Sequence, residues 1–485
     1  MDIRDEVSRR RTFAIISHPD AGKTTLTEKL LLYGGAIVTA GQVAARRRAR
    51  AATSDWMELE RERGISITST VLQFPYRDHT MNLLDTPGHQ DFGEDTYRTL
   101  LAADSAVMLI DAAKGVEPQT RKLFAICRAR RIPLFTFINK MDRPSRDPLE
   151  LLDELENVLG IAAYPMNWPL GNGETFRGVY DRASGELHLF ERTEHGAKRA
   201  PVRATAPDDP AIAALVDERT RREFLDHLEL LEGAGAAFDP RRLLRGDVTP
   251  VFFGSAVTNF GVELFLDAFV RLGPPPLPRV DAERRRVDPA DERFSGFVFK
   301  IQANMDPRHR DRVAFLRVCS GKFERDMTVH NARSGKDVRL TRAMKLFASE
   351  RESVDVAFAG DVVGLANPGV FAIGDTLAEG EGVRFEPILA AVGALQFEVV
   401  KYRLESEYNV KTVFQTLPYT TARRVRGEGA ATATLGSSAR LVEDWDGNPL
   451  ALFESAWSIN LAQQWNPGLS FEPFGASDLA REVPA

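Results

Sequence analysis

The sequence predicts an α/β domain at the N-terminal end, then a small antiparallel β-barrel and a C-terminal α+β domain. In the first half of the 485-residue chain, short apolar runs alternate with longer amphipathic segments, which is the pattern of a parallel sheet covered by helices. Further on, apolar and polar residues alternate and glycines interrupt them, as in a small barrel. A chain of this length exceeds one hydrophobic core, so several domains are expected.

Short apolar segments of the first domain read as buried strands, and turn residues follow each of them. The predicted strands are residues 12–16, 81–84, 106–110, 132–138 and 251–253. Amphipathic periodicity predicts helices at residues 26–33, 147–159 and 217–231. The alternation of strands and helices therefore supports the α/β assignment.

Breaks in composition mark the predicted domain boundaries. A proline-rich run at residues 273–278 leads into a charged stretch at 281–293, and neither easily continues a helix or a strand. We expect the first domain at 1–276 with an inserted subdomain at about 145–248, a linker at 277–293, the barrel at 294–380 and the last domain at 381–485. In the last domain, a strand at 391–393 and a helix at 395–407 are expected.

Charge and cysteine content narrow the possible partners and compartments. The 69 acidic and 63 basic side chains give a formal charge of -6, so nothing attracts nucleic acid overall and we expect no DNA binding. Cys127 and Cys319 are the two cysteines, which argues against a disulfide scaffold or a zinc cluster and favours the cytoplasm. The apolar run 13–16 is too short for a signal peptide, and no apolar stretch is long enough to span a bilayer.

Residues 17–25, with the sequence SHPDAGKTT, follow a predicted strand and precede a predicted helix. This is the phosphate-loop (P-loop) pattern, with Ser17 where the first glycine usually lies. Backbone amides and the helix N-terminus would face phosphates, Lys23 would add a positive charge, and the Thr24 hydroxyl would ligate Mg²⁺. The alternative is a chance Gly-Lys-Thr at a helix start, which the strand-loop-helix context disfavours.

Three further motifs follow predicted strands in the order that GTP binding requires. Asp85-Thr-Pro-Gly88 would direct Asp85 to the metal side of the nucleotide and the Gly88 amide to the γ-phosphate. Asn139-Lys-Met-Asp142 would let the Asp142 carboxylate accept both N–H donors of guanine. Adenine lacks these donors and would leave a buried charge unpaired. Residues 254–256 can present an amide to guanine O6. Each motif alone could be an ordinary turn, but together they predict GTP binding.

His89 directly follows Gly88, where related small GTPases carry a glutamine that orients water. An imidazole at this position can hold the attacking water and form a hydrogen bond toward the γ-phosphate. The alternative is a surface histidine with no role in catalysis. His18 and His79 lack such a context, and we assign neither a catalytic role.

With these motifs in place, the chain resembles the translational GTPases, most closely their bacterial release factor 3 branch. The matching segments are SHPDAGKTT (17–25), SDWM (54–57), RGISIT (63–68), DTPGH (85–89), DTYRT (95–99), DAAKG (111–115) and FVFKIQANMD (297–306). The resemblance runs from 11 to about 375 and resumes at 391–410. Between these ranges the family carries a further helix and strand, so the resemblance implies a shortened C-terminal domain.

The resemblance also implies individual roles. The Ser66 hydroxyl would bind Mg²⁺ when GTP is bound, with Thr68 as the alternative. Ile65 and Pro19 would form an apolar gate beside His89. Residues 46–50, rich in arginine, would contact ribosomal RNA phosphates or remain a solvated loop. The residues expected to bind the nucleotide are Ser17, His18, Pro19, Asp20, Ala21, Gly22, Lys23, Thr24, Thr25, Asp85, Thr86, Pro87, Gly88, His89, Asn139, Lys140, Met141, Asp142, Ser255 and Ala256, and those expected to bind the metal are Thr24, Ser66 and Asp85.

The expected activity is Mg²⁺-dependent hydrolysis of GTP to GDP on the ribosome. We expect a cytoplasmic monomer whose role is to promote dissociation of class I release factors. No internal arginine finger is evident, so we expect slow intrinsic turnover that a partner stimulates. One alternative is an elongation or ribosomal-protection factor, which the lack of room for that group's distal domains disfavours. The other is a paralogue that binds GTP and a partner but is uncoupled from the ribosome, which would suit a shortened C-terminal domain.

Overall fold

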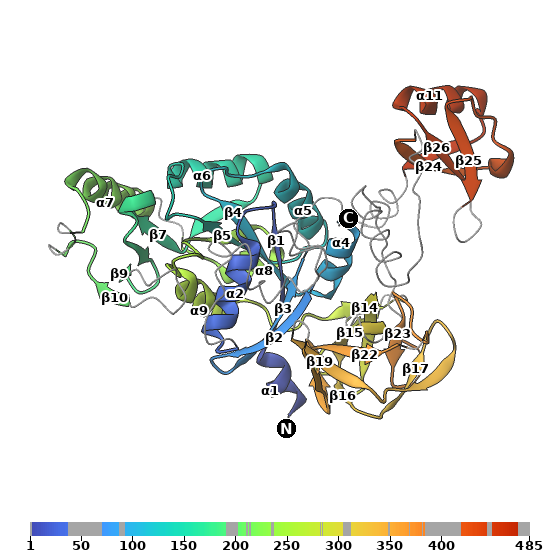
Figure 1. Cartoon of the computed structure of the whole chain (residues 1–485), viewed down its shortest axis with the longest axis horizontal. Helices are drawn as coiled ribbons and strands as arrows, with labels where there is room; N and C mark the ends of the chain where they lie inside the picture. Colours follow the sequence, from blue (N-terminus) through green and yellow to red (C-terminus); the bar gives the residue numbers. More distant parts are fainter. Residues whose placement is uncertain are drawn as a thin grey trace, which may run out of the picture. The chain divides into compact units, whose positions relative to one another are not determined.

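The computed structural model of the chain forms two compact units, Met1–Ile388 and Leu389–Ala485, which are described separately. Figure 1 shows the chain with its elements labelled. The residues that the structure describes are 2–36, 70–86, 93–190, 202–209, 212, 215–233, 237–281, 283, 285–303, 312–347, 350–367, 369–380, 382–383, 419–443 and 449–473. Within these residues, no helix is long and apolar enough to cross a membrane.

A largely parallel sheet forms the centre of the first unit. Its strands, in spatial order, are β2 (Thr70–Tyr76), β3 (His79–Asp85), β1 (Arg10–Ser17), β4 (Ser105–Asp111), β5 (Leu134–Asn139), β11 (Val248–Phe253) and β6 (Ala162–Pro165). All neighbours pair in parallel except β2 and β3. The five predicted strands are confirmed. Strands β2 and β6 were not predicted.

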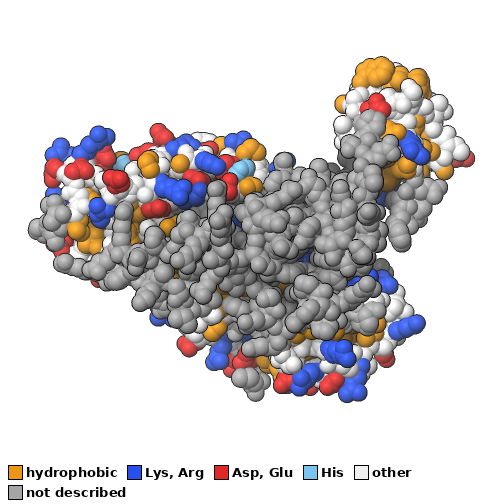
Figure 2. All heavy atoms as spheres, in the orientation of Figure 1, with side chains coloured by type: hydrophobic (Ala, Val, Ile, Leu, Met, Phe, Trp, Pro, Cys, Tyr) orange, Lys and Arg blue, Asp and Glu red, His pale blue; other side chains and the backbone are white. Residues whose placement is uncertain are grey.

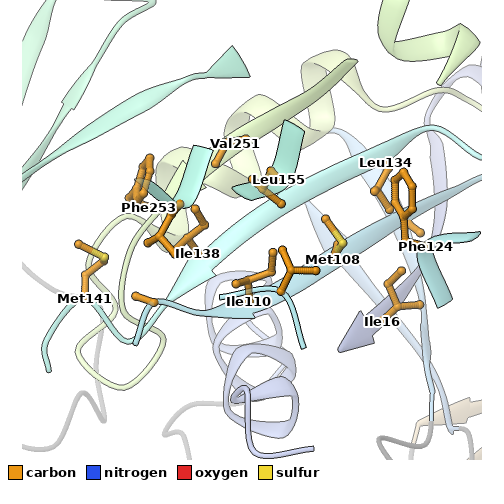
Figure 3. Packing of buried hydrophobic residues seen from close by; sticks show 14 of the residues in the cluster. Ile16, Met108, Ile110, Phe124, Leu134, Ile138, Met141, Leu155, Val251 and Phe253 are labelled. Atoms are coloured by element: carbon orange, nitrogen blue, oxygen red, sulfur yellow. The ribbon is translucent and has the colours of Figure 1, made fainter. Parts of the chain in front are cut away.

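Both faces of this sheet are covered, so its central strands are apolar on both sides. Ile16 of β1 belongs to one buried cluster and its neighbour Ile15 to the other. Figure 3 shows Ile16, Met108, Ile138 and Val251, from four neighbouring strands, packed with Phe124 of α5 and Leu155. The helices around the sheet are α1 (Ile3–Ser8), α2 (Lys23–Tyr33), α4 (Gly93–Ala102), α5 (Pro118–Ala129) and α9 (Val262–Leu272).

A small antiparallel sheet and several helices are inserted between β5 and β11. The strands are β7 (Asn167–Leu170), β8 (Gly178–Asp181), β9 (Glu186–Phe190) and β10 (Val202–Thr205), and the helices are α6 (Pro148–Glu154), which continues into a π-helical turn at Leu155–Leu159, α7 (Glu218–Gly233) and α8 (Pro240–Arg245). The fully buried Trp168 packs its ring against Phe253 of β11, which anchors the insertion to the main sheet. The helices predicted at 147–159 and 217–231 are confirmed.

A curled antiparallel sheet follows, as predicted for the β-barrel, and we call it the barrel. Its strands are β14 (Ser295–Ala303), β15 (Arg312–Ser320), β16 (Lys322–Glu324), β17 (Thr328–Asn331), β18 (Lys336–Arg339), β19 (Ala343–Phe347), β20 (Glu350–Ser353), β21 (Val356–Phe358), β22 (Val362–Ala366) and β23 (Thr376–Ala378). Before the barrel, β12 (Arg279–Val280) and β13 (Arg286–Val287) form a short antiparallel pair where we expected no strand. The proline run ends at Pro278, so residues from Arg279 onward have N–H groups that can pair.

Buried polar groups join the barrel to the main sheet within the first unit. Strand β19 pairs with β2. Arg317 of β15 donates to Asp104, just before β4, over 2.5 Å, and these side chains are 1% and 0% exposed. Arg10 of β1 donates to Asp361 over 2.8 Å. Buried charges of this kind are tolerated only when they are paired, so this joint depends on a specific fit between the two regions.

The second unit is an α+β arrangement, as predicted. Its antiparallel sheet has the order β25 (Ala439–Glu443), β26 (Pro449–Phe453), β24 (Thr421–Arg426), β27 (Ser470–Pro473), and α11 (Ala456–Trp465) packs against it. The strand expected at 391–393 and the helix expected at 395–407 lie outside the described residues.

Candidate nucleotide-binding site

The candidate site lies at the carboxyl ends of neighbouring parallel strands. Ser17 ends β1, Asp85 ends β3, Asn139 ends β5, and residues 254–256 follow β11. Strands β3, β1, β4, β5 and β11 are consecutive neighbours in the sheet, so these ends meet at one edge. Open α/β sheets bind ligands at this edge. The structure therefore brings together four motifs that are far apart in the sequence.

The loop between β1 and α2 has the geometry of an anion-binding loop. Helix α2 begins at Lys23, directly after Gly22. Gly22 has a φ of 100°, and a Cβ atom there would lie 2.3 Å from Asn139 Nδ2, so glycine is required for two reasons. The backbone of Asp20 also lies in the left-handed region, with a φ of 66°. The buried Ser17 Oγ has no hydrogen-bond partner in the described structure. A helix N-terminus behind such a loop suits a phosphate.

Lys23 and Asp85 form a buried ion pair. Lys23 Nζ lies 2.7 Å from Asp85 Oδ1, and the two side chains are 6% and 2% exposed. The sequence led us to expect Lys23 at the phosphates and Asp85 on the metal side. In the structure each compensates the buried charge of the other, which neither could sustain alone. Thr86, the next residue, donates its hydroxyl to the Ile15 carbonyl over 2.5 Å and so fixes the end of β3 against β1.

The Asn139 side chain connects the phosphate loop to the segment after β11. Its Nδ2 donates to the Ala21 carbonyl over 2.9 Å, and its Oδ1 accepts from the Ala256 amide over 2.8 Å. The neighbouring Ser255 amide donates to the Phe260 carbonyl over 2.9 Å. The amides of Ser255 and Ala256, expected near guanine O6, therefore already have partners within the protein. The Asn139 side chain therefore holds the phosphate loop and the segment after β11 together.

Asp142 carries an unpaired buried oxygen. Its Oδ1 is shielded from solvent and has no hydrogen-bond partner in the described part of the chain. The preceding Met141 is fully buried, and its amide donates to the Gly254 carbonyl over 3.1 Å, which holds the segment against β11. A buried acceptor without a donor is costly. A ligand with N–H groups, such as guanine, would satisfy it.

Lys140, which follows β5, connects the phosphate loop to the end of β4 through Asp111, a residue that we did not select from the sequence. Its Nζ donates to the Asp20 carbonyl over 2.5 Å and to Asp111 Oδ2 over 2.7 Å. Burial alone would raise the pKa of Asp111, but the hydrogen bonds from Lys140 and the Ala113 amide outweigh it, so the pKa lies below its usual value. The sequence signals for Asp111 were its position at the end of a buried strand and its place in the matching segment DAAKG (111–115), but neither indicated its partner.

The remaining predicted residues fall into three groups. His18 lies beside the loop, with its Nε2 3.3 Å from Glu117 Oε1. Thr24 and Thr25 lie in the first turn of α2. The third group lies outside the described residues and consists of Ile65, Ser66, Thr68, Pro87, Gly88, His89 and the basic segment 46–50. In the part of the chain that the structure describes, no group of three or more His, Cys, Asp or Glu could hold a metal ion.

Comparisons with known families agree with this architecture. Three family models match: the GTP-binding domain of elongation factor Tu at residues 8–275, domain 2 of elongation factor G at 293–380, and the C-terminal domain of class II release factor RF3 at 363–463. A crystal structure of a Thermus thermophilus protein superposes with a TM-score of 0.62 at 22% identity and covers 96% of this chain and 67% of that one. This likeness supports the fold alone.

Curated relatives are similar over nearly the whole chain. Peptide chain release factor 3 of Gloeobacter violaceus is 56% identical over 518 residues, covering 96% of this chain and 97% of the relative. The protein of the same name from Symbiobacterium thermophilum is 51% identical over 519 residues, covering 97% and 98%. These alignments are longer than the 485-residue chain, so the relatives hold residues that it lacks. The location of these residues in the C-terminal domain stays a prediction.

Proposed function

The chain belongs to the release factor 3 family of translational GTPases, and we propose that it acts on the ribosome after termination, where GTP binding drives dissociation of a class I release factor. It is a GTP hydrolase of translation termination. We further propose that it works in the cytoplasm as a monomer. The observation that most supports a guanine nucleotide site is the unpaired buried Asp142 oxygen at the strand edge that carries the phosphate loop.

In this proposal the loop amides and Lys23 hold the phosphates, and Asp142 accepts the two guanine N–H groups. Asn139 and Lys140 would position the phosphate loop and Asp142. Their side chains form hydrogen bonds to the phosphate loop, and Asn139 also accepts from the Ala256 amide after β11. Binding of GTP would draw Lys23 away from Asp85 toward the phosphates. Asp85 would then be free to face the metal side.

Thr24, Asp85 and Ser66 are the residues that would hold magnesium together with phosphate oxygens. Bound magnesium neutralises charge on the phosphate oxygens during phosphoryl transfer. Thr24 is in the first turn of α2 and Asp85 ends the neighbouring strand β3, so both belong to the edge of the sheet that carries the phosphate loop. His89 would hold the attacking water in line with the γ-phosphate. Since we expect no internal arginine finger from the sequence, rapid hydrolysis would require the ribosome.

Replacing Asp142 with Asn should weaken GDP binding by roughly 10- to 100-fold, because charge-assisted bonds to the guanine N–H pair are lost. The same variant should gain affinity for XDP, since xanthine carries an oxygen where guanine carries the amino group, and the Asn amide can donate to it. Calorimetric titration with both nucleotides measures the change. Glu150→Gln, an exposed acid on α6, is the matched control and should bind GDP normally. Unchanged GDP affinity in the Asp142 variant would remove Asp142 from the base site.

The release activity itself can be observed directly. A fluorescent class I release factor bound to terminated ribosomes should dissociate faster when the chain is added with a non-hydrolysable GTP analogue, and the analogue alone should have no effect. The expected result follows if GTP binding, rather than hydrolysis, drives dissociation. An unchanged rate, with binding of the analogue intact, would favour a GTP-binding paralogue that is uncoupled from the ribosome.

A further inference from the structure

The subdomain inserted between β5 and β11 reaches the end of β11 through the first residue of β7, Asn167. The described register between β6 and β11 ends where Pro165 faces Val251. Beyond this point, Asn167 Oδ1 accepts from the Phe253 amide over 2.7 Å, and its Nδ2 donates to the Phe253 carbonyl over 3.0 Å. The Asn167 side chain therefore pairs with the last residue of β11 as a neighbouring strand would.

This pair of hydrogen bonds is shielded from solvent. Asn167 is 1% exposed, and Phe253 and the neighbouring Trp168 are fully buried. The rings of Trp168 and Phe253 contact each other edge to face. A buried amide or carbonyl that lost its partner would find no water to replace it, which is unfavourable. Asn167 therefore fixes the position at which β11 ends.

The end of β11 is connected to the segment that carries Asp142. Gly254 follows Phe253, and its carbonyl accepts from the Met141 amide over 3.1 Å. The Gly254 amide donates to the Ile138 carbonyl of β5 over 3.0 Å. Figure 3 shows Phe253, Ile138 and Met141 gathered at the same end of the main sheet. Because Met141 directly precedes Asp142, a shift of Phe253 would pass through Gly254 to the Asp142 segment.

A second contact from the insertion holds the other polar group of the Met141 backbone. The amide of Gly173, in the short 3₁₀ turn Gly173–Thr175, donates to the Met141 carbonyl over 2.7 Å. Gly173 has a φ of 57°, and a Cβ atom there would lie 3.3 Å from the Pro144 nitrogen. Glycine thus allows the turn to lie close against the backbone that follows Asp142. The insertion therefore holds this segment directly and also through β11.

The insertion is packed as part of the core of the first unit. Its residues Leu170, Phe176 and Val179 belong to the same buried cluster as Ile138 and Met141. Figure 2 shows acidic and basic side chains on the outer surface over α7 and α6. The insertion thus presents its charged face to solvent and its apolar residues to the main sheet, so its contacts with the Met141 segment have a firm support.

We propose that Asn167 is a positioning residue for guanine recognition. By fixing the end of β11, and together with Gly173, it holds the Met141 backbone so that the Asp142 carboxylate faces the N–H groups of the base. Asn167 does not touch the nucleotide and acts through Asp142, as a supporting residue that keeps a binding group in place. This inference rests on the proposed guanine site and adds the inserted subdomain to the parts that shape it.

The test compares GDP with inosine diphosphate (IDP), which lacks only the exocyclic amino group that Asp142 is proposed to bind. The ratio of the two affinities reports on this contact. It does not depend on stability, because an unfolded chain binds neither nucleotide. The full chain should bind GDP at least about tenfold more tightly than IDP, since one charge-assisted hydrogen bond distinguishes them. Competition with a fluorescent GDP derivative measures both affinities.

Asn167→Ala should lower the ratio of GDP to IDP affinity by at least about threefold, because Asp142 is no longer held toward the amino group. Gly173→Ala should lower the ratio in the same direction, since its new methyl group crowds the backbone after Asp142. This second variant decides the question if Asn167→Ala does not fold.

Arg182→Ala is the matched control within the insertion. The Arg182 side chain also forms two hydrogen bonds to backbone, donating to the Pro165 carbonyl over 3.0 Å and to the Leu231 carbonyl over 3.3 Å. Neither of these contacts leads to Met141. The control should therefore keep the ratio of the unmodified chain, even if it lowers the free energy of unfolding.

Asp142→Ala separates a failure of this inference from a failure of the proposed base site. It should bring the ratio close to one, and an unchanged ratio would remove Asp142 from the base site altogether. If Asp142→Ala abolishes the preference for GDP but Asn167→Ala, or Gly173→Ala in its place, keeps it, the positioning role is overturned and the base site stands. An equal loss of preference in Arg182→Ala would also overturn it, because any loosening of the insertion would then have the same effect.

Discussion

Replacing His89 with Ala is expected to lower ribosome-stimulated GTP hydrolysis by roughly 10²- to 10⁴-fold while leaving GDP affinity unchanged. The expected loss is that of a side chain that positions and polarises the attacking water in the transition state. Ground-state binding depends on Lys23 and Asp142 instead, which the substitution does not touch. Phosphate release in the presence of ribosomes and calorimetric titration with GDP give the two quantities.

His79→Ala is the matched control, because His79 begins strand β3, the strand whose opposite end is Asp85. A side chain at that distance from the nucleotide motifs should have no effect on hydrolysis. If the His89 variant also lost GDP binding, His89 would have a structural role. If it hydrolysed GTP normally, another group would position the water.

Replacing Arg317 with Ala is expected to destabilise the first unit by about 3 kcal/mol, because it leaves Asp104 with a buried, poorly compensated charge. Asp104 keeps two partners in this variant, because Arg279 lies 3.3 Å from it and the Leu277 amide donates to its carboxylate over 3.1 Å. The loss of stability should therefore lie at the lower end of the range for broken buried ion pairs. Equilibrium unfolding in urea measures the change in the free energy of unfolding. The same contact joins the barrel to β4, so the variant also tests how firmly the two regions are coupled.

Two further variants separate this effect from a general loss of charge. Arg219→Ala removes an arginine whose pair with Glu223 is exposed to solvent, and it should leave the free energy of unfolding almost unchanged. The double variant Arg317→Met, Asp104→Leu should recover part of the lost stability, because it leaves no buried carboxylate unpaired, and the partly exposed Arg279 keeps its hydrogen bonds to the Leu101 and Ala103 carbonyls. A loss of less than about 1 kcal/mol for Arg317→Ala would mean that the joint does not depend on this ion pair.

The main sheet was predictable because its central strands are buried on both faces and therefore read as continuous apolar runs. Strand β2, which lies between β3 and β19, was not predicted, because the partly exposed Gln73 and the exposed Pro75 interrupt its apolar run. The four strands of the inserted sheet contain only four or five residues each. Segments this short have too little periodicity to stand out from loops.

The candidate site was predictable as a set of motifs, but its internal contacts were not. Local sequence fixes which residues end a strand, whereas the strand register decides which of them meet. Asp111 and Asn139 are partners in the register of β4 and β5, and this brings Asp111 to Lys140. The pair of Lys23 with Asp85 depends in the same way on β1 lying beside β3.

The rate of GTP hydrolysis with and without ribosomes tests the central claim most directly. The proposal is that this chain is a ribosome-dependent GTPase of termination with a slow intrinsic rate. It predicts that adding terminated ribosomes raises turnover by orders of magnitude, within the roughly 10³- to 10⁵-fold range that partners confer on GTPases lacking their own arginine finger. The same slow turnover with and without ribosomes, in a chain that binds GTP normally, would contradict it.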